Sequence, residues 1–588
     1  MRLDQPGFSK IFQINAIILF SMMILLTSCG RANLDAIAQT TLSVDSTLFP
    51  QATLTVTSTE NPATATATLL SPQQQQNNGS GAGLIVFAMG DGEYKHLFAY
   101  HPSYLPITRL TSEAWDDDSP AISPDGNKIV FTSNRFGTWD IFLLDLPSNT
   151  LTQLTKTNDF EGSPYFSPDG QYITYDLYRG NRFNILIQSV SDPTEAPIQL
   201  TDGTSNNFNP AWSPSAPEIA FVTDRSGRNE IWLARLDDPE NRFSKIIASA
   251  DADYSDPAWS PDGVTLAWSR CKTVCEIEVV QPLDLEPSPI SLGTGNTPVW
   301  LPDGSGVLAT LKLPNQNEFI AYAVSDRHLL LPPIPLPGVV SAYDWKAGQV
   351  STNIQIYLSS TQISQPASLW AEKRSIASSG TGRRGLVLLK DVEAPQPYLS
   401  DAALESFIQL RSITSKKTGW DLLAILENAS LSLTAPPLPG IIQNWLYSGR
   451  AIALNLAPFE AGWMSISREE FFGETFWRVW VKCQKQDGTC GVPLTNPAWD
   501  FNSRYSGDLI AFEEGGKTAS IPAGYWIDFT ELAYRFGWER LSSQSNWRSY
   551  FPGILFNTFV FRQGLSWDEA LGELYPSEAV DLLIENQK

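Results

Sequence analysis

Histidine is scarce in this sequence of 588 residues. His96, His101 and His328 are the three that occur, so the sequence beyond residue 328 has none. A Ser-His-Asp hydrolase uses an imidazole as its general base, and this part of the sequence also lacks a Gly-x-Ser-x-Gly motif for a nucleophilic serine. The sequence therefore argues against a serine hydrolase there.

Basic residues are also few. The chain has 40 Lys and Arg against 63 Asp and Glu, a formal net charge of -23. Nucleic-acid binding depends on clustered Lys and Arg, so we expect no nucleic-acid partner. Anionic lipid headgroups would repel the chain as well. With 42% hydrophobic and 11% aromatic residues, most of the chain is expected to be globular, in two or three domains.

The sequence contains five cysteines. Cys29 stands alone, whereas Cys271 lies close to Cys275 and Cys483 close to Cys490. Each close pair predicts a disulfide at a hairpin tip in an oxidising compartment. The alternatives are four free thiols or a zinc site. The spacings differ from those of common zinc sites, so we expect no metal, and no motif predicts another cofactor.

The first 29 residues have the features of an export signal. Arg2 and Lys10 flank the start of an apolar stretch, residues 11–26, and Leu26-Thr27-Ser28-Cys29 follows. This segment resembles the signal peptide and lipobox of bacterial lipoproteins. The alternatives are an ordinary signal peptide or a membrane-spanning helix, for which the stretch is short. The resemblance implies a lipoprotein with acyl chains such as palmitate on Cys29, anchored to the outer face of the cytoplasmic membrane or to the outer membrane.

Residues 30–82 are rich in Thr, Ser, Ala, Gln, Asn and Gly, with "ATATATLL" and "QQQQNNGSG" as the plainest stretches. Such a segment cannot bury enough apolar surface to offset chain entropy, so we expect a disordered tether. About fifty residues of this kind reach roughly 40 Å. The tether would hold the folded part clear of the lipid headgroups.

A sequence pattern centred on a tight turn occurs five times. Its proline anchors are separated by 44, 46, 47 and 41 residues, and Ser-Pro-Asp-Gly supplies the backbone angles that a tight turn needs. Each unit continues with an apolar run, a polar tip, a second apolar run and often a fourth strand that ends in Leu-Thr. Four strands at this period are typical of a propeller blade. The anchors are Pro124, Pro168, Pro214, Pro261 and Pro302.

The two ends of the repeat array are incomplete in complementary ways. Residues 83–111 contain the second, third and fourth strands of a unit, and residues 339–348 contain a first strand alone. Pairing the strand near 340–346 with those of 83–111 would complete a split blade and leave no free sheet edge. The expected fold class is mainly β, with a closed six-bladed β-propeller over residues 83–348.

The repeated pattern Asp/Asn-x-x-Pro-x-Trp/Phe-Ser-Pro-Asp-Gly, followed by Ile/Val-x-Phe and Arg-x-Gly-x-x-Asp/Glu-Ile, resembles the TolB-type, WD-repeat-like β-propeller. The resemblance covers about 260 residues, and four of the five turns keep Asp-Gly, whereas Ser215-Ala216 departs from it. It implies a binding or scaffolding domain of the cell envelope, often for proteins and sometimes for peptides or glycans. Fold alone does not fix function.

Residues 349–399 are an expected linker, and residues 400–588 an expected α+β domain of unknown function. Helical spacing runs through residues 401–433, and residues 475–484 predict a strand. Asp528 is expected to begin a helix within residues 526–541, and Ser566 to cap a last helix, residues 566–574. Ten of the nineteen tryptophans lie in this domain. They predict an aromatic core or, alternatively, an aromatic groove for glycan or peptide.

A short segment of this domain has a second resemblance. Residues 444–455, "NWLYSGRAIALN", with "YRFGWERL" and "NWRSYFPG" later, are similar to zinc D,D-carboxypeptidases of peptidoglycan, whose motif is His-x-x-Gly-Arg-Ala-x-Asp. Gly449, Arg450 and Ala451 are kept, but Leu446 and Ala453 replace the His and the Asp. Without these ligands zinc has no site, so the resemblance implies a domain that holds cell-wall peptides without cutting them.

The loops that lead into the first strands share aromatic, acidic and amide residues. Equivalent loops of a propeller gather around one mouth of the central channel, so we expect a ligand-binding rim there. Its negative potential would favour a basic peptide or a cation. Alternatively, Asp and Asn in these loops satisfy turn amides. The rim residues are Trp115, Asp116, Asp117, Asp118, Asp159, Phe160, Glu161, Asn207, Phe208, Asn209, Asp253, Tyr254 and Asp256.

Two function classes follow. The first is a non-catalytic lipoprotein scaffold that binds protein, peptide or cell-wall glycan partners. The second is an envelope hydrolase acting on glycan or peptidoglycan, which would need two carboxylates at a set separation. Glu460, Glu469, Glu470 and Asp528 are available, but their spacing forms no recognisable pair. We expect the scaffold, with no catalytic residue.

Overall fold

The computed structural model describes residues 83–101, 105–282, 288–346, 369, 383–436, 441 and 443–587. The predicted signal peptide with Cys29, the predicted tether and most of the predicted linker lie outside these described residues. They stay predictions from the sequence. No helix among the described residues is long and apolar enough to cross a membrane.

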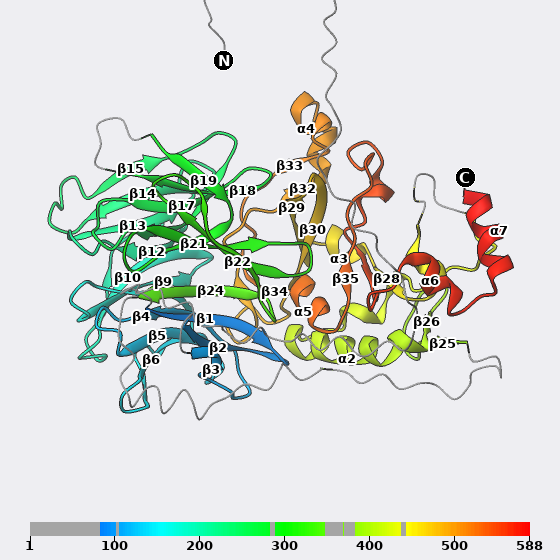
Figure 1. Ribbon diagram of the computed structural model, residues 1–588, viewed down its shortest axis with the longest axis horizontal. Helices are drawn as coiled ribbons and strands as arrows, with labels where there is room; N and C mark the ends of the chain where they lie inside the picture. The colour runs from blue at the N-terminus through cyan, green and yellow to red at the C-terminus, as the bar shows by residue number, and fades with distance from the viewer. Residues whose placement is uncertain are drawn as a thin grey trace, which may run out of the picture. The chain divides into compact units, whose positions relative to one another are not determined.

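Six four-stranded antiparallel sheets make up the first part of the described chain (Figure 1). The first sheet joins β24 (Val340–Lys346) to β1 (Leu84–Asp91), β2 (Tyr94–His101) and β3 (Leu105–Arg109). The second contains β4 (Asp117–Ile122), β5 (Lys128–Ser133), β6 (Asp140–Asp145) and β7 (Thr150–Gln153). The third contains β8 (Phe160–Phe166), β9 (Tyr172–Arg179), β10 (Arg182–Ser189) and β11 (Ile198–Gln199).

The other three sheets also use consecutive strands. The fourth contains β12 (Asn207–Trp212), β13 (Glu218–Thr223), β14 (Glu230–Arg235) and β15 (Phe243–Ile247). The fifth contains β16 (Asp253–Trp259), β17 (Leu266–Cys271), β18 (Cys275–Val280) and β19 (Ile290–Thr294). The sixth contains β20 (Asn296–Trp300), β21 (Gly306–Lys312), β22 (Asn317–Ala323) and β23 (Leu329–Pro335).

The repeated turn forms for a local reason. In the third sheet Ser167 Oγ donates a hydrogen bond to Asp169 Oδ1 (2.6 Å), which also accepts one from Gln171 N (3.0 Å). Gly170 has a φ of 68°, which glycine adopts at little cost. Ser260 and Asp262 form the same contact in the fifth sheet. The Ser-Pro-Asp-Gly sequence therefore encodes the link between the first and second strands of a sheet.

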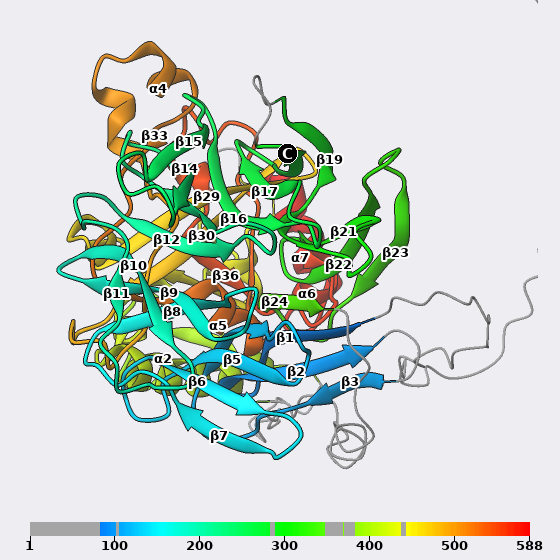
Figure 2. The ribbon, with the colours of Figure 1, turned by 90° about the vertical axis from the view of Figure 1, so that its left-hand side faces the viewer.

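Neighbouring sheets share apolar side chains, and the two ends of the array do so too. The predicted strand near residues 340–346 pairs with β1, from Leu84 opposite Lys346 to Met89 opposite Val340. Phe87 of β1 and Leu308 of β21 belong to one buried cluster, which joins the first sheet to the sixth. Figure 2 shows these sheets from the left-hand side of Figure 1.

The C-terminal part combines short helices with two four-stranded sheets. One sheet has the order β27 (Leu426–Asn428), β28 (Ala451–Leu454), β36 (Thr558–Val560), β35 (Glu539–Arg540). The other has the order β29 (Met464–Phe471), β30 (Glu474–Lys482), β34 (Tyr525–Asp528), β31 (Val492–Pro493). Strands β25 (Leu386–Leu388) and β26 (Tyr398–Ser400) form a ribbon, as do β32 (Trp499–Asp500) and β33 (Lys517–Thr518). The α-helices are α2 (Asp401–Thr418), α3 (Ala457–Glu460), α4 (Leu509–Glu513), α5 (Phe529–Arg535), α6 (Trp567–Gly572) and α7 (Ser577–Gln587).

Two predicted helices differ from the structure. The helical spacing of residues 401–433 continues past α2, but Gly419 ends that helix with a φ of 83°, and β27 follows. The helix after Ser566 is not the last one, because α7 follows α6. Three other predictions are confirmed. Residues 475–484 fall almost entirely in β30, the Asp528 carboxylate caps α5, and Ser566 forms a capping box with Glu569.

Most tryptophans of the C-terminal domain are buried. Trp477 and Trp538 are fully enclosed and share one apolar cluster with residues of α2, α5 and the two larger sheets. Trp477 meets the Trp547 ring edge to face at 5.2 Å. The aromatic residues thus build the core, as the first of the two alternatives predicted. Those buried are Trp445, Trp477, Trp526, Trp538, Trp547 and Trp567.

Candidate functional site

One end of the six-sheet array contacts the C-terminal domain, and we call this end the mouth. Trp139 Nε1, between β5 and β6, donates a hydrogen bond to the Gly491 carbonyl (2.9 Å). Gly524 N, just before β34, donates one to Tyr178 Oη on β9 (2.7 Å). Loops that enter the first strands lie at the mouth. Further hydrogen bonds run from Asn229 Nδ2 to Thr495 O (3.1 Å) and from Arg540 Nε to Pro314 O (3.0 Å).

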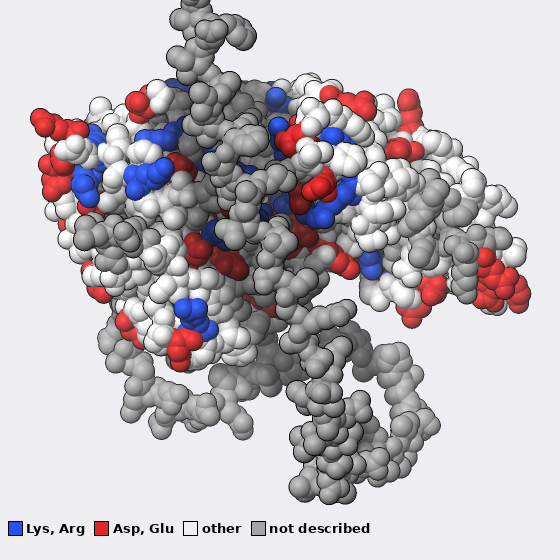
Figure 3. Space-filling view, turned by 90° about the horizontal axis from the view of Figure 1, so that it is seen from above, with Lys and Arg blue, Asp and Glu red and all other residues white. Residues whose placement is uncertain are grey.

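A cavity of about 780 Å³ lies between the mouth and the C-terminal domain, and we call it the mouth cavity. Pockets for small ligands have volumes of roughly 300–1,000 Å³. Its lining has nine basic and eight acidic residues, so it is nearly neutral although the chain carries a formal charge of -23. On the face shown in Figure 3, acidic and basic side chains are likewise interspersed over the described surface.

Seven of the thirteen predicted rim residues line the mouth cavity. They come from the second, fourth and fifth sheets and the loops before them. The other six lie nearby in the same loops and strands but are not part of its lining. Those that line it are Trp115, Asp116, Asp118, Phe208, Asn209, Asp253 and Asp256. Those that do not are Asp117, Asp159, Phe160, Glu161, Asn207 and Tyr254.

Most rim carboxylates have cationic partners. Lys417, in the last turn of α2, lies 3.3 Å from Asp116 and so links the mouth to the C-terminal domain. Burial alone would raise the pKa of Asp116, but Lys417 and Arg535 outweigh it and the pKa lies below its usual value. The negative charge predicted at the rim is thus largely compensated. Other pairs are Asp117–Arg135 (2.9 Å), Asp118–Lys95 (3.0 Å), Asp159–Arg179 (2.7 Å) and Asp253–Arg228 (2.8 Å).

The aromatic and amide residues of the rim outside the cavity lining have packing and bonding roles. Phe160 contacts the Trp139 ring at 6.1 Å, and Tyr254 contacts Trp268 edge to face at the same distance. Asn207 Nδ2 donates a hydrogen bond to the Ser205 carbonyl (2.9 Å). These contacts support the view that part of the rim sequence serves the fold.

Glu161 differs from the paired carboxylates. It is 1% exposed and accepts a hydrogen bond from Thr157 Oγ1 (3.1 Å). Burial raises its pKa to about 8. Asp176, which accepts a hydrogen bond from Asn209 N, also has its pKa raised by burial, to about 6. The third sheet therefore holds two carboxyl groups whose charged form burial disfavours.

An ion-pair network from the C-terminal domain forms the opposite wall of the mouth cavity. Arg478 of β30 donates from Nε to Glu469 Oε1 (2.8 Å) and from Nη1 to Asp528 Oδ2 (2.6 Å). Arg540 contacts the other oxygen of Glu469 (2.5 Å). Burial would raise the pKa of Glu469, but Arg478 and Arg540 hold it far below its usual value. This carboxylate remains ionised at any physiological pH.

A second ion-pair network joins β2 to α5. Glu531 pairs with Arg535 one turn later on the helix and lies 3.9 Å from Lys95. Burial would raise the pKa of Glu531, but Lys95 and Arg535 hold it well below its usual value. Lys95 also binds Asp118, so the network runs from the rim to α5. Sequence reasoning missed these basic partners, since no local pattern relates residues more than 400 positions apart.

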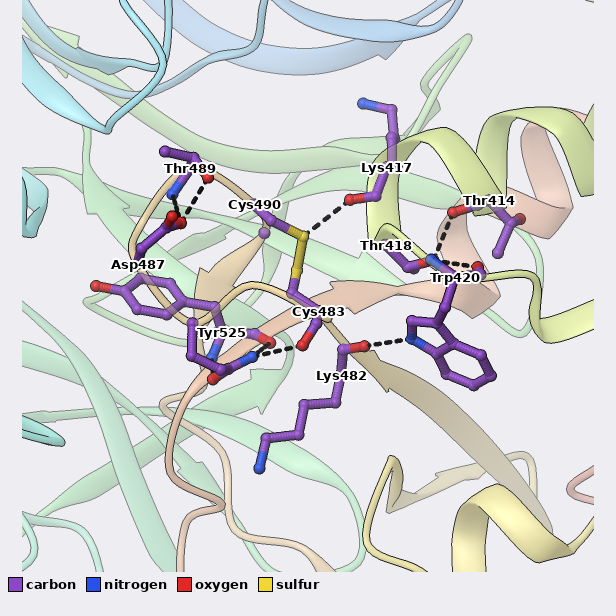
Figure 4. The surroundings of a disulfide bond; sticks show 12 residues. Thr414, Lys417, Thr418, Trp420, Lys482, Cys483, Asp487, Thr489, Cys490 and Tyr525 are labelled. Atoms are coloured by element: carbon purple, nitrogen blue, oxygen red, sulfur yellow. Dashed lines mark hydrogen bonds between the residues drawn. A yellow bond between two sulfur atoms is a disulfide. The ribbon is translucent and has the colours of Figure 1, made fainter.

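Both predicted cysteine pairs are disulfides, Cys271–Cys275 and Cys483–Cys490. The second lies where the two parts of the chain meet. Figure 4 shows Cys490 Sγ beside the Lys417 carbonyl oxygen, at 2.8 Å, and Cys483 N bonded to the Tyr525 carbonyl. Cys483 is fully buried in an apolar cluster that includes residues of the third, fourth and fifth sheets.

The segment that resembles D,D-carboxypeptidases is structural in this chain. Arg450 is 1% exposed, donates to Glu573 Oε2 (2.6 Å) and to the Phe561 carbonyl (3.1 Å), and so ties β28 to the chain before and after α6. Leu446 and Ala453, at the predicted ligand positions, are buried. Among the described residues, no group of three or more His, Cys, Asp or Glu side chains could hold a metal ion.

The four-stranded antiparallel sheets and their repeated turns define a β-propeller domain. Residues 139–327 match the family model of the TolB beta propeller domain, so the propeller is of TolB type. A protein TolB homolog of Chlorobium luteolum is 29% identical over 143 residues, which cover 24% of this chain and 31% of that protein. An uncharacterized protein of Agrobacterium fabrum is 29% identical over 198 residues, which cover 31% of this chain and 66% of that protein.

The chain therefore spans less than two thirds of the length of either relative. Among solved structures, TolB from Acinetobacter baumannii is 18% identical, with a TM-score of 0.40, and the match covers 45% of this chain and 67% of that one.

Proposed function

We propose that this protein is an exported lipoprotein scaffold whose closed six-bladed propeller and C-terminal domain together bind protein, peptide or cell-wall partners without catalysis. The observation that carries the proposal is the TolB-type domain at residues 139–327. The domain boundaries are those drawn from the sequence: propeller 83–348, linker 349–399 and C-terminal domain 400–588. The pairing of β24 with β1 supports the closed ring.

Ion pairs at the mouth join the propeller to the C-terminal domain. Most rim carboxylates already pair with cations, including Lys417 of the C-terminal domain. A basic partner would have to displace these cations, so we infer that partners bind the two domains as one unit. The rim then acts through the residues that face the mouth cavity.

The alternative, a hydrolase that uses carboxylates, gains one supporting observation, because Glu469 and Asp528 both line the mouth cavity. Such an enzyme needs a carboxylic acid that donates a proton. Arg478 binds both carboxylates, and the pKa of Glu469 lies far below its usual value. An ionised Glu469 cannot be that acid, and this favours the scaffold.

Affinity capture from envelope extracts tests the proposal. The full chain should retain specific envelope proteins or muropeptides, and triple replacement of Asp116, Asp118 and Asp253 by Asn should reduce capture, because these rim carboxylates line the mouth cavity. Screening the same protein on peptidoglycan and glycans separates the two classes. Turnover of either polymer, or failure to capture any partner, would contradict a non-catalytic scaffold.

Metabolic labelling with an alkyne analogue of palmitate tests the anchor. The wild-type chain should incorporate the label and partition with membranes. A Cys29→Ala variant should do neither, whereas replacement of Cys271 and Cys275 should leave labelling unchanged. A labelled Cys29→Ala chain would contradict lipidation at this residue.

A further inference from the structure

Lys312 is set apart from the other lysines that line the mouth cavity. It is the last residue of β21 and lines the cavity. Among the described residues, no carboxylate lies within 4.0 Å of the Lys312 ammonium group, and that group forms no hydrogen bond. The other four lysines of the lining each contact a carboxylate. These pairs are Lys95–Asp118 (3.0 Å), Lys272–Asp251 (2.6 Å), Lys416–Glu93 (3.2 Å) and Lys417–Asp116 (3.3 Å).

A second cation lies close to Lys312. Pro314, two residues after Lys312, accepts a hydrogen bond from Arg540 Nε (3.0 Å), and Arg540 shares Glu469 with Arg478. Burial lowers the pKa of Lys312, and the charge of Arg478 lowers it further. Arg478 uses Nε and Nη1 to bind Glu469 and Asp528, and in the described part of the chain its Nη2 has no hydrogen-bond partner. Two like charges with free N–H groups thus face the same cavity. Carboxylates offset part of the repulsion between them, but none contacts the Lys312 ammonium group, so an anion between the two cations would stabilise the pair further.

The charges around this pair balance, but Lys312 has no direct ionic partner. Lys312, Arg478 and Arg540 are three cations, and Glu469, Asp528 and Asp256 provide three negative charges. Glu469 and Asp528 contact the two arginines, and Asp256 acts on Lys312 only from a distance. Its carboxylate accepts hydrogen bonds from Asn209 Nδ2 (2.7 Å) and Ser255 Oγ (2.8 Å), and not from Lys312.

We propose that the mouth cavity binds a small anionic ligand through a carboxylate or phosphate group, which Lys312 and Arg478 hold together. An ammonium and a guanidinium N–H both form strong, charge-assisted hydrogen bonds to either group. The cavity, about 780 Å³, leaves room for the rest of a ligand beside the tryptophans of its wall. The site therefore selects ligands by one anionic group and accepts a partly apolar body.

Calorimetric titration of the full chain tests this site. Inorganic phosphate and N-acetylalanine are the two probes, and they distinguish a phosphate ligand from a carboxylate ligand. We expect one saturable site for at least one probe. Lys312→Met should weaken binding at least tenfold, and Lys312→Arg should keep most of the affinity. Lys272→Met is the matched control, because it removes the same charge from the same cavity lining where Asp251 already pairs with the lysine. It should change the affinity less than twofold.

Lys312→Gln provides a second variant if Lys312→Met does not fold, and thermal melts check both. The glutamine keeps hydrogen-bonding groups but loses the charge, so it should also weaken binding at least tenfold. Absence of saturable binding to either probe in the wild-type chain would overturn the proposal. Equal affinity in the wild type and a folded Lys312 variant without the charge would overturn it too.

Discussion

Ion pairs have different surroundings in the propeller and in the C-terminal domain. Arg235 and Glu218 pair within the fourth sheet, and the arginine side chain is 37% exposed. In the C-terminal domain Glu469 bridges Arg478 and Arg540, which belong to different sheets and are 18% and 3% exposed. The propeller relies on repeated apolar contacts between sheets, and the Arg235–Glu218 pair lies at its periphery, although Asp117 and Arg135 form a buried pair at the mouth. The C-terminal domain has charges inside its contact with the propeller, where losing one partner leaves another uncompensated.

The largest expected effect separates these two kinds of ion pair. Arg478→Met leaves Glu469 and Asp528 partly unpaired in a buried place, which should cost about 3–5 kcal/mol of unfolding free energy. Arg235→Met should cost no more than about 1 kcal/mol, as exposed pairs do. Urea unfolding followed by tryptophan fluorescence measures both. Equal losses of unfolding free energy in the two variants would contradict the distinction between buried and exposed ion pairs.

The next effect concerns Glu161 and pH. Its folded pKa, about 8, is higher than the usual 4.5, so the folded state binds a proton that the unfolded state has lost between these values. Stability should therefore be greatest below about pH 4.5 for this group and fall as pH rises to 8, by a few kcal/mol at most. Glu161→Gln should flatten the pH dependence of the unfolding free energy. An unchanged slope from pH 5 to pH 8 in the variant would contradict the assignment.

Removing each of the two disulfides should change stability by an intermediate amount, and by different amounts. Both close short loops, so by loop entropy alone each contributes about 2 kcal/mol. Cys483 is also buried in a cluster shared with the propeller, whereas the Cys271–Cys275 hairpin is more exposed. Replacing Cys483 and Cys490 by Ala should lower the melting temperature more than replacing the other pair. The reverse order would indicate that the contact between the domains contributes little.

The smallest expected change in unfolding free energy concerns two tryptophans at the mouth. Trp139→Phe loses the hydrogen bond to Gly491 and should cost about 1 kcal/mol. Trp115→Phe is the control, because in the described structure the indole N–H of Trp115 has no partner. It should cost measurably less. Chemical unfolding of the two variants side by side gives the difference.

The propeller could be predicted from the sequence because its information is local and repeated. Each Ser-Pro-Asp-Gly turn contains the groups that form it, and the period places the strands, including the split pair β1 and β24. The helix after Asp401 was predicted too long, since its apolar spacing continues beyond Gly419, where the backbone turns.

The candidate site was only partly predictable. The repeat placed the rim residues at one mouth, but nothing in their loops shows that Lys417 lies beside Asp116, 301 positions away. Lys312 and Arg478 carry no motif at all. Their proposed role depends on which residues lie near them in the folded chain, and a single sequence does not contain that information.

The central claim is that the C-terminal domain covers the mouth of the propeller. Carbodiimide coupling with peptide mass spectrometry tests it directly, because this reagent joins amines and carboxylates only when they touch. We predict links between Lys417 and Asp116 and between Lys416 and Glu93, alongside the Lys272–Asp251 link inside the propeller as a positive control. Formation of the control link without either of the other two would contradict the account.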